Sequence, residues 1–321
     1  MKTETKKRLY FVLLGVALFI ISFLAGAASR MSSISIDKKF RVEWNDNVGR
    51  KITDLSYGKG SENKFDLYLP ADNKRKAYGL VVYIHPGGFT SGDKADDKEL
   101  LQWLCSKGYV AASINYTLAT EKNPGANVYT QSMDIRRAMP VVVKEARKHG
   151  YNITEMAIGG GSAGGTLAML YAYRDATTSP IPVKMLFECV GPSSFYSEDW
   201  TPYGTDKDPK AAAGLFSMLL GKKINPNLFG TAAYDSIMKP ISAYMWVDSL
   251  SVPTVCAYGS YDKVCPFLSS RHLIKALKDN HVPFQYFEAT HSGHGLQNDT
   301  DVYAAYMQTV SDWLDKYLPI Q

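Results

Sequence analysis

One short glycine-rich stretch contains the residue best suited to attack a substrate. Residues 160–164 read Gly-Gly-Ser-Ala-Gly, a G-x-S-x-G pattern that follows an apolar run and precedes the apolar segment 166–170. A strand, a sharp turn and a helix in this order hold the central serine at the top of a sheet, where only small residues fit beside it. The pattern nominates Ser162 as a nucleophile for acyl transfer. A plain tight turn gives the same spacing, so the assignment depends on partners elsewhere in the chain.

A second glycine pair follows another apolar run, where residues 85–89 read His-Pro-Gly-Gly-Phe. Acyl transfer builds negative charge on the carbonyl oxygen, and backbone N–H groups held in a loop stabilise that charge. We expect the N–H groups of Gly87 and Gly88 to form this oxyanion hole together with that of Ala163, which follows the nucleophile. Each such donor is typically worth about 3–4 kcal/mol of barrier. His85 is expected to hold the loop in place, and a simple Pro-Gly turn is the alternative.

A serine hydroxyl also needs a histidine to take its proton and a carboxylate to hold that imidazole. Asp262 follows the strand-like residues 253–258, and His294 follows the alternating residues 283–288. The order Ser162, Asp262, His294 is the order expected of an α/β hydrolase, with both partners on loops after late strands.

Three other residues compete for these two roles. Asp248 and Asp279 look like acids on the surface of a helix or loop, whereas Asp262 lies in a Gly-x-x-Asp turn after a strand. His291 is the alternative to His294, which we favour because flanking glycines leave its ring free and it lies nearer the final helix. The two histidines also match a His-x-x-His metal pattern, but no third ligand with suitable spacing lies nearby, so no metal is expected.

With these motifs the sequence resembles the α/β-hydrolase carboxylesterases and lipases of the hormone-sensitive-lipase type and the related acetyl-xylan and feruloyl esterases, over roughly residues 50–318. The motifs that carry the resemblance come in the family's order: residues 65–70 (Phe-Asp-Leu-Tyr-Leu-Pro), residues 85–89, residues 115–121 (Asn-Tyr-Thr-Leu-Ala-Thr-Glu), the Ser162 elbow, the Asp262 turn and the His294 loop. The resemblance implies an α/β-hydrolase fold, with a mostly parallel central sheet flanked by helices. It also implies a serine esterase that needs neither a metal nor an organic cofactor.

Four residues depart from the family pattern. Pro86 stands where the first of three glycines is usual, and Gly161 stands where the elbow often carries Asp. Thr117 and Thr120 replace the usual Arg and Pro. Pro86 removes only its own N–H, so the two glycines after it remain available as donors. These departures concern the subfamily and the substrate rather than the chemistry.

Apolar segments of strand length alternate with segments of helix length, which predicts parallel strands joined by crossover helices. The expected elements are strands 79–84, 109–114 and 156–159 and helices at about 96–107 and 131–149. Pro140 lies inside the last of these helices, where we expect a kink or a break. After the N-terminal segment about 290 residues remain, enough for one large catalytic domain over residues 31–321.

Residues 192–250 interrupt this alternation and carry no obvious strand. They contain an apolar stretch at 211–221 that is expected to form a short helix between loops. The resemblance implies that an insertion at this place forms a cap or lid over the serine. Phe216, Met218 and Leu219 then line an acyl pocket, or they pack as ordinary core beneath the insertion.

The N-terminal residues indicate a membrane. Lys6-Lys7-Arg8 precedes an uncharged run from Leu9 to Ala28, which exceeds the usual core of a signal peptide and is long enough to span a bilayer. We expect residues 1–30 to form a retained anchor, with the catalytic domain outside the cytoplasm. A signal peptide cut near residues 25–27, which leaves a secreted protein, is the alternative.

The charge balance gives no reason to expect a nucleic-acid partner. Residues 1–30 hold five basic residues and one acid, so they supply +4 of the net charge of +5. The rest of the chain is therefore close to neutral. The four cysteines (Cys105, Cys189, Cys256 and Cys265) show no C-x-x-C pair and no zinc spacing, and a Cys256–Cys265 disulfide stays open.

The sequence therefore predicts a serine carboxylic-ester hydrolase that forms an acyl-enzyme and acts on a small-molecule ester. Two alternatives stay open. A serine peptidase or amidase uses the same three residues, and a membrane-anchored binding protein can use the same fold without catalysis. Oligomeric state and acyl-chain length are not determined by the sequence.

Overall fold

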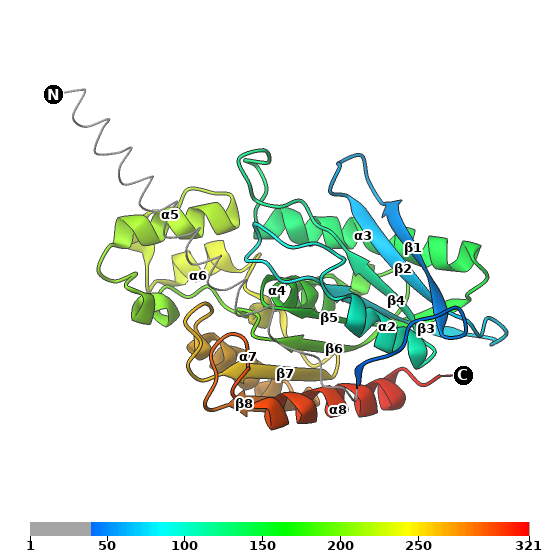
Figure 1. Ribbon diagram of the computed structural model, residues 1–321. Helices are drawn as coiled ribbons and strands as arrows, with labels where there is room; N and C mark the ends of the chain where they lie inside the picture. Colours follow the sequence, from blue (N-terminus) through cyan, green and yellow to red (C-terminus); the bar gives the residue numbers. More distant parts are fainter. Residues whose placement is uncertain (1–39, 321) are drawn as a thin grey trace. The chain divides into compact units, whose positions relative to one another are not determined.

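The computed structural model describes residues 40–320, which form an eight-stranded sheet with helices on both faces (Figure 1). The strand order is β1-β2-β4-β3-β5-β6-β7-β8. Strand β2 pairs antiparallel with β1 and with β4, and all later neighbours pair in parallel. The strands are β1 (Gly49–Ser56), β2 (Lys64–Pro70), β3 (Tyr78–Ile84), β4 (Val110–Ile114), β5 (Ile153–Gly161), β6 (Val183–Cys189), β7 (Thr254–Gly259) and β8 (Phe284–Ala289). This sheet confirms the predicted α/β class and its mostly parallel pairing.

Strand β3 shows why the central strands read as unbroken apolar runs. It lies between β4 and β5, and all seven of its residues are buried. Leu80, Val82 and Ile84 pack in the core on one face of the sheet, whereas Val81 and Tyr83 pack in the core on the other. Since successive side chains of a strand point to opposite faces, a parallel strand covered on both sides must be apolar at every position.

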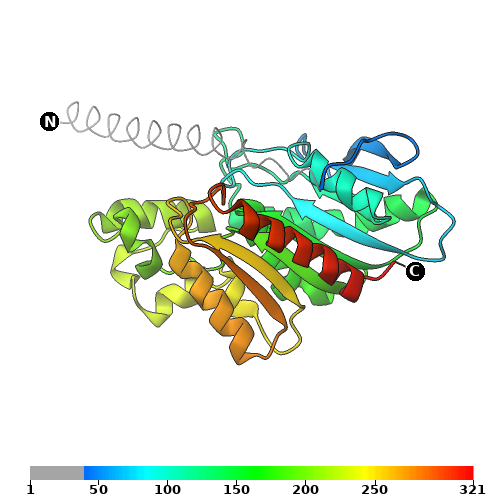
Figure 2. The same ribbon diagram turned by 60° about the horizontal axis from the view of Figure 1, so that its bottom comes forward.

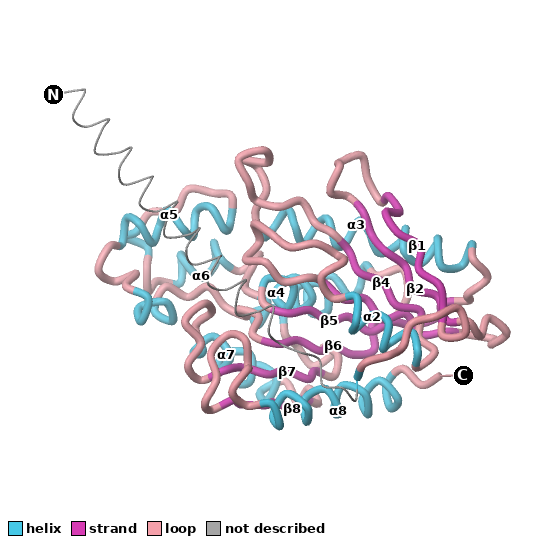
Figure 3. The backbone as a smooth tube through the Cα atoms, in the orientation of Figure 1, coloured by secondary structure: helices cyan, strands magenta, loops and turns pink. Residues whose placement is uncertain are grey.

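Five helices cover the two faces. Helices α3 (Val128–Lys148), α4 (Ala163–Leu170) and α7 (Phe267–Asp279) contribute buried side chains to one core. Helices α2 (Lys98–Ser106) and α8 (Thr300–Tyr317) contribute to the other, and α8 runs across its face of the sheet (Figure 2). The strands form one layer within this helical cover (Figure 3). Because β3 and β5–β8 run parallel, the loops after their carboxyl ends lie along one edge of the sheet, where such folds place their sites.

The predicted elements are present with shifted ends, and one prediction about α3 is wrong. The predicted strand 156–159 is the central part of β5, and the predicted helix 131–149 is α3. The break expected at Pro140 is absent, since α3 continues through it from Val128 to Lys148. Pro140 lies on the exposed side of α3, where water can satisfy the carbonyl that loses its N–H partner, and the opposite side stays packed.

Residues 192–250 connect β6 to β7 without a strand among them. They contain α5 (Pro209–Leu220), α6 (Ala232–Met238) and short 3-10 turns, including one at Glu198–Tyr203. Helix α5 confirms the helix expected at 211–221.

The apolar residues of α5 divide between the interior and the surface. Phe216 is fully buried, with ring centroids 5.8–5.9 Å from those of Trp200, Phe229 and Tyr234. Leu219 is also buried, whereas Met218 is 46 % exposed. Phe216 therefore packs as core of the insertion, which is the second of the two roles that the sequence left open.

The predicted membrane segment, residues 1–30, lies outside the described residues. Among residues 40–320, no helix has both the length and the apolar character needed to span a bilayer. All four cysteines are free thiols, so the Cys256–Cys265 disulfide that the sequence left open is not formed.

Candidate active site

Ser162 sits on a strained turn between β5 and α4. Its backbone has φ of 52° and ψ of −123°, a conformation that costs a non-glycine residue about 1–3 kcal/mol. A Cβ added to Gly164 would lie under 3 Å from the backbone carbonyls of Ile84 and His85, and one added to Gly160 would meet Gly164. The two glycines of the G-x-S-x-G pattern are thus required because the start of α4 packs directly on the end of β3 and on its own strand.

His294 links Ser162 to Asp262. The Nε2 atom of His294 lies 2.8 Å from Ser162 Oγ, and its Nδ1 lies 2.7 Å from Asp262 Oδ2. Because a carboxylate only accepts hydrogen bonds, Nδ1 carries the proton and Nε2 is free to accept the serine proton. All three residues are almost completely buried. The structure therefore brings the three predicted residues together in the order of a nucleophile, a base and an orienting acid.

The loop after β7 fixes the orientation of Asp262. Its Oδ1 accepts the backbone N–H groups of Val264 at 2.7 Å and Cys265 at 3.0 Å, which leaves Oδ2 for the histidine. The hydroxyl of Tyr203 donates to the backbone carbonyl of Asp262 at 2.7 Å. Tyr203 belongs to the insertion, so this contact joins the insertion to the acid-bearing loop.

The competing residues bind elsewhere. Asp248 accepts hydrogen bonds within its own exposed turn, and Asp279 pairs with Lys275 on the surface of α7. His291 is exposed and binds Asp299, 2.9 Å away. Among the described residues, none of these three forms a hydrogen bond with Ser162.

The loop after β3 begins where α4, the helix that follows Ser162, packs against it. Gly87 has φ of 134° and Gly88 has φ of 59°, and a Cβ on Gly87 would overlap the carbonyl of Ser91. In the part of the chain that the structure describes, neither glycine N–H donates to another backbone or side-chain group. Ala163 is the first residue of α4, where N–H groups lack a partner within the helix. These three N–H groups are the predicted oxyanion donors, and Gly164 brings α4 against the start of this loop.

His85 has a structural role in the loop after β3. Its Nδ1 donates to the carbonyl of Pro86 at 2.7 Å, and its ring stacks on Tyr116 with centroids 4.4 Å apart. Burial lowers the pKa of His85, so the ring is neutral. The hydroxyl of Tyr116 also donates to the backbone carbonyl of His85 at 3.1 Å. The residue holds the loop in place, as the sequence predicted.

Cys265 lies beside Asp262 and His294, and the three residues form a group of possible metal ligands. The ligand atoms of Asp262, Cys265 and His294 lie within 4.8 Å of one another. However, the carboxylate and the imidazole are already hydrogen-bonded to each other, and the imidazole binds Ser162. Zinc would require both to turn toward the thiol, so the hydrogen-bonded chain accounts better for the arrangement.

Sequence reasoning missed two residues near the site. Glu188, at the end of β6, is fully buried, and burial raises the pKa of its carboxyl to about 8. An acid within the apolar segment 183–189 is a signal that could have identified it. Gln131, on α3, is also fully buried and donates to the carbonyl of Phe89 in the loop that carries Gly87 and Gly88. No local motif surrounds Gln131, so the sequence carries no comparable signal for it.

Comparison with curated proteins identifies several hydrolases. Esterase LipQ from Mycobacterium tuberculosis is 26% identical over 286 residues, which cover 82% of this chain and 62% of LipQ. Kynurenine formamidase from Danio rerio is 26% identical over 139 residues, which cover 43% of this chain and 44% of the relative. A non-reducing polyketide synthase from Stereocaulon alpinum is 28% identical over 181 residues, 54% of this chain but 7% of the synthase. The chain thus spans less than two thirds of the length of each of these relatives.

Several solved structures with the same fold are esterases. An inhibited esterase B from Lactobacillus rhamnosis has a TM-score of 0.69 at 18% identity, with 95% of this chain and 98% of that chain covered. A truncated carbohydrate esterase from gut microbiota has a TM-score of 0.63 at 18% identity, with 83% and 98% covered. At this identity the likeness establishes the fold, which is the predicted α/β-hydrolase fold.

A family model provides the assignment. The BD-FAE model matches residues 65–277, more than half of the chain, from β2 into α7. This region contains Ser162, Asp262 and the loop of Gly87 and Gly88. The curated relatives include esterases, and the structural neighbours share the α/β-hydrolase fold. The chain belongs to the BD-FAE family of α/β hydrolases, which confirms the resemblance found in its sequence.

Proposed function

We propose that this protein hydrolyses small carboxylic esters through an acyl-enzyme on Ser162. The observation that carries the proposal is the hydrogen-bonded chain from Ser162 through His294 to Asp262, with distances of 2.8 and 2.7 Å. The same three groups, in this geometry, activate serine for acyl transfer on several unrelated folds.

Ser162, His294 and Asp262 each have a distinct role in the reaction. Ser162 Oγ attacks the ester carbonyl carbon while its proton passes to His294 Nε2, and Asp262 stabilises the imidazolium. The negative oxygen of the tetrahedral intermediate accepts hydrogen bonds from the N–H of Ala163 and from those of Gly87 and Gly88, in the loop at residues 85–89 after β3, hereafter the oxyanion loop. The carbon–oxygen bond to the alcohol then breaks, and His294 returns its proton to the leaving alkoxide. Water repeats the sequence on the acyl-enzyme, which releases the acid and restores the serine.

The test is hydrolysis of p-nitrophenyl esters from acetyl to decanoyl by the full chain and by its Ser162→Ala variant. Loss of the nucleophile should lower kcat by at least about 10⁴-fold. The acyl-length profile of the parent enzyme then measures the acyl pocket. Turnover that survives in the folded variant would refute Ser162 as the nucleophile. Absence of turnover by the parent on every ester would favour amide hydrolysis, a very narrow substrate range or a non-catalytic role.

Hydrolysis of an aryl formamide is a second candidate function. The match to kynurenine formamidase raises it, because an amide carbonyl can be attacked by the same serine. An amide differs in its leaving group, since the departing nitrogen must be protonated as the bond breaks. Parallel assays with an N-formyl aryl amine and the matching aryl ester decide between them. A higher kcat/KM for the formamide would assign the protein to amide hydrolysis.

Two further roles are proposed for segments outside the core. Residues 192–250 act as a cap over the serine, a role supported by the contact between Tyr203 and the backbone carbonyl of Asp262. Residues 1–30 anchor the chain in a membrane with the catalytic domain outside the cytoplasm, as their basic start and apolar run indicate. Recovery of the full chain in the membrane fraction supports an anchor. Recovery of a shortened chain in the medium identifies a cleaved signal instead.

A further inference from the structure

Gln131 joins two loops that flank the serine. It lies in the first turns of α3 and is fully buried. Its side-chain Nε2 donates to the backbone carbonyl of Phe89 at 2.7 Å and to that of Thr117 at 2.9 Å. Because both partners are carbonyl oxygens, the amide orientation follows from the hydrogen bonds. Its Oε1 has no partner among the described residues, so the contribution of this side chain comes from its two N–H donors.

The carbonyl of Phe89 belongs to the oxyanion loop itself. Phe89 directly follows Gly88 and has φ of 68°, a left-handed conformation that is costly for a bulky residue. Such a conformation persists only where surrounding contacts enforce it. Two donors meet at this carbonyl, Gln131 from α3 and the backbone N–H of Ala119 at 2.9 Å. The direction of the chain after Gly88 therefore depends on hydrogen bonds from outside the loop.

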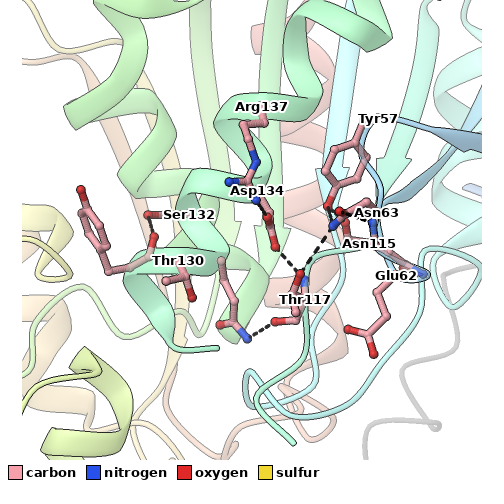
Figure 4. A network of polar contacts seen from close by, with 12 residues as sticks. Tyr57, Glu62, Asn63, Asn115, Thr117, Thr130, Ser132, Asp134 and Arg137 are labelled. Atoms are coloured by element: carbon pink, nitrogen blue, oxygen red, sulfur yellow. Dashed lines mark hydrogen bonds and ion pairs between the residues drawn. The ribbon is translucent and has the colours of Figure 1, made fainter. Parts of the chain in front are cut away.

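Hydrogen bonds in the first turns of α3 fix the position of Gln131. Asn127 caps the start of α3, and its side chain and backbone exchange hydrogen bonds with Thr130 in a capping box. One turn after Gln131, Asp134 accepts the backbone N–H of Thr117 at 2.9 Å. Figure 4 shows Asp134 and Thr117 within a polar network that also includes Asn63 and Tyr57. Side chains of α3 thus form hydrogen bonds with both the N–H and the C=O of Thr117. These contacts place Gln131 within hydrogen-bond distance of Phe89.

We propose that Gln131 is a positioning residue for the oxyanion hole. It orients the carbonyl of Phe89 and thereby fixes the N–H groups of the preceding glycines toward the developing oxyanion. The inference rests on the proposed ester hydrolysis and identifies a residue that acts through the loop without touching substrate. Preorganised donors lower the barrier only when they are already aimed at the oxygen, so a displaced loop should affect kcat more than KM.

The test compares Gln131→Met with Thr117→Val. Methionine preserves length and volume but removes both donors, whereas Thr117→Val removes only the side-chain hydroxyl of the neighbouring loop. Removing one oxyanion donor costs about 10²–10³-fold in kcat, so a misaligned loop should cost about 10–100-fold. We expect Gln131→Met to show this loss on p-nitrophenyl acetate with KM changed by less than about twofold. Thr117→Val should stay within about threefold of the parent, because the oxyanion donors are untouched.

An alkyl boronic acid supplies a second readout. Its adduct with a serine places a tetrahedral oxygen in the oxyanion hole, so its inhibition constant should rise in Gln131→Met by about the same factor as kcat falls. A folded Gln131→Met enzyme with parent-like kcat and boronate affinity would overturn the proposal. If that variant does not fold, Gln131→Asn, whose amide is one methylene too short, carries the same expectation. Failure of both to fold would make Gln131 a residue of the fold alone and would also overturn it.

Failure of the proposed function has a different outcome. An inactive parent enzyme that binds no boronate would remove ester hydrolysis and this inference together. An active parent with an unaffected Gln131→Met variant removes only the inference.

Discussion

Glu188 should make this protein less stable as the pH rises. Its carboxyl is fully buried at the end of β6, and burial raises its pKa from 4.5 to about 8. The hydroxyl of Tyr258 and the backbone N–H of Gly191, which donates to Oε2 at 3.0 Å, offset part of this effect. Its Oε1 has no hydrogen-bond partner among the described residues. The native state therefore keeps Glu188 protonated at neutral pH.

The sign and size of the effect follow from proton linkage. Below pH 4.5 both the folded and the unfolded chains hold this proton, so Glu188 contributes no pH dependence. Between pH 4.5 and about 8 only the folded chain holds it, and the free energy of unfolding falls as pH rises. At about 1.4 kcal/mol per pH unit, with a smaller slope near each pKa, the loss between pH 5 and pH 8 amounts to about 3–4 kcal/mol.

The assay is urea unfolding at pH 5, 6, 7 and 8 of the parent chain, Glu188→Gln and Glu155→Gln. Glutamine cannot ionise and can still accept the N–H of Gly191, so Glu188→Gln should lack this loss. All other titrating groups are common to both proteins and cancel in the difference. Glu155 pairs with Lys184 on the partly exposed part of β5, so its neutralisation should change stability by no more than about 1 kcal/mol at any pH. Parallel pH profiles for the parent and Glu188→Gln would refute the assignment of a buried, protonated Glu188.

Three further predictions concern the site. Asp262→Asn should lower kcat on p-nitrophenyl acetate about 10⁴-fold with little change in KM, because the amide favours the wrong imidazole tautomer; a loss below tenfold would argue against this role. Gly164→Ala should abolish activity and lower the free energy of unfolding by about 3 kcal/mol or more, since its Cβ would overlap the carbonyl of Ile84. Gly161→Ala is its control, because the nearest atoms are a tyrosine hydroxyl at 3.1 Å and a thiol at 3.6 Å, and equal losses in urea unfolding would contradict the packing argument. Tyr203→Phe should cost about 1 kcal/mol in the same unfolding assay and lower kcat a few-fold, because it frees the loop of Asp262 from the insertion; an unchanged enzyme would show that the contact has no such role.

Much of the site could be predicted because its residues lie in local turns. Ser162, Asp262 and His294 each follow a strand-like segment, and each has a glycine within three residues, so short stretches of sequence reveal them. The choice of Asp262 over Asp248 and Asp279 used the same logic, and the structure places only Asp262 against the histidine. The alternation of apolar segments likewise predicted the parallel sheet, because strand and crossover lengths are local properties.

Other features needed the packed chain. The effect of Pro140 on α3 depends on which side of the helix faces solvent, and that side is decided by the sheet beneath it. The depth of Glu188 likewise depends on how β6 and α4 meet, since its carboxylate lies beside Gly165 and Gly191.

What the sequence by itself predicted is the proposed chemistry: a candidate nucleophile, base, acid and backbone donors, each identified by a turn that a few residues specify. Only the tertiary structure decided how these groups are held. The bond from Gln131 to Phe89 joins residues 42 positions apart, and the bond from Tyr203 to Asp262 joins residues 59 apart. Such contacts form when distant segments pack together, and their energy depends on burial and orientation rather than on neighbouring residue types. The position of the proposed attacking group is therefore a local property of this chain, whereas its support is a property of the whole fold.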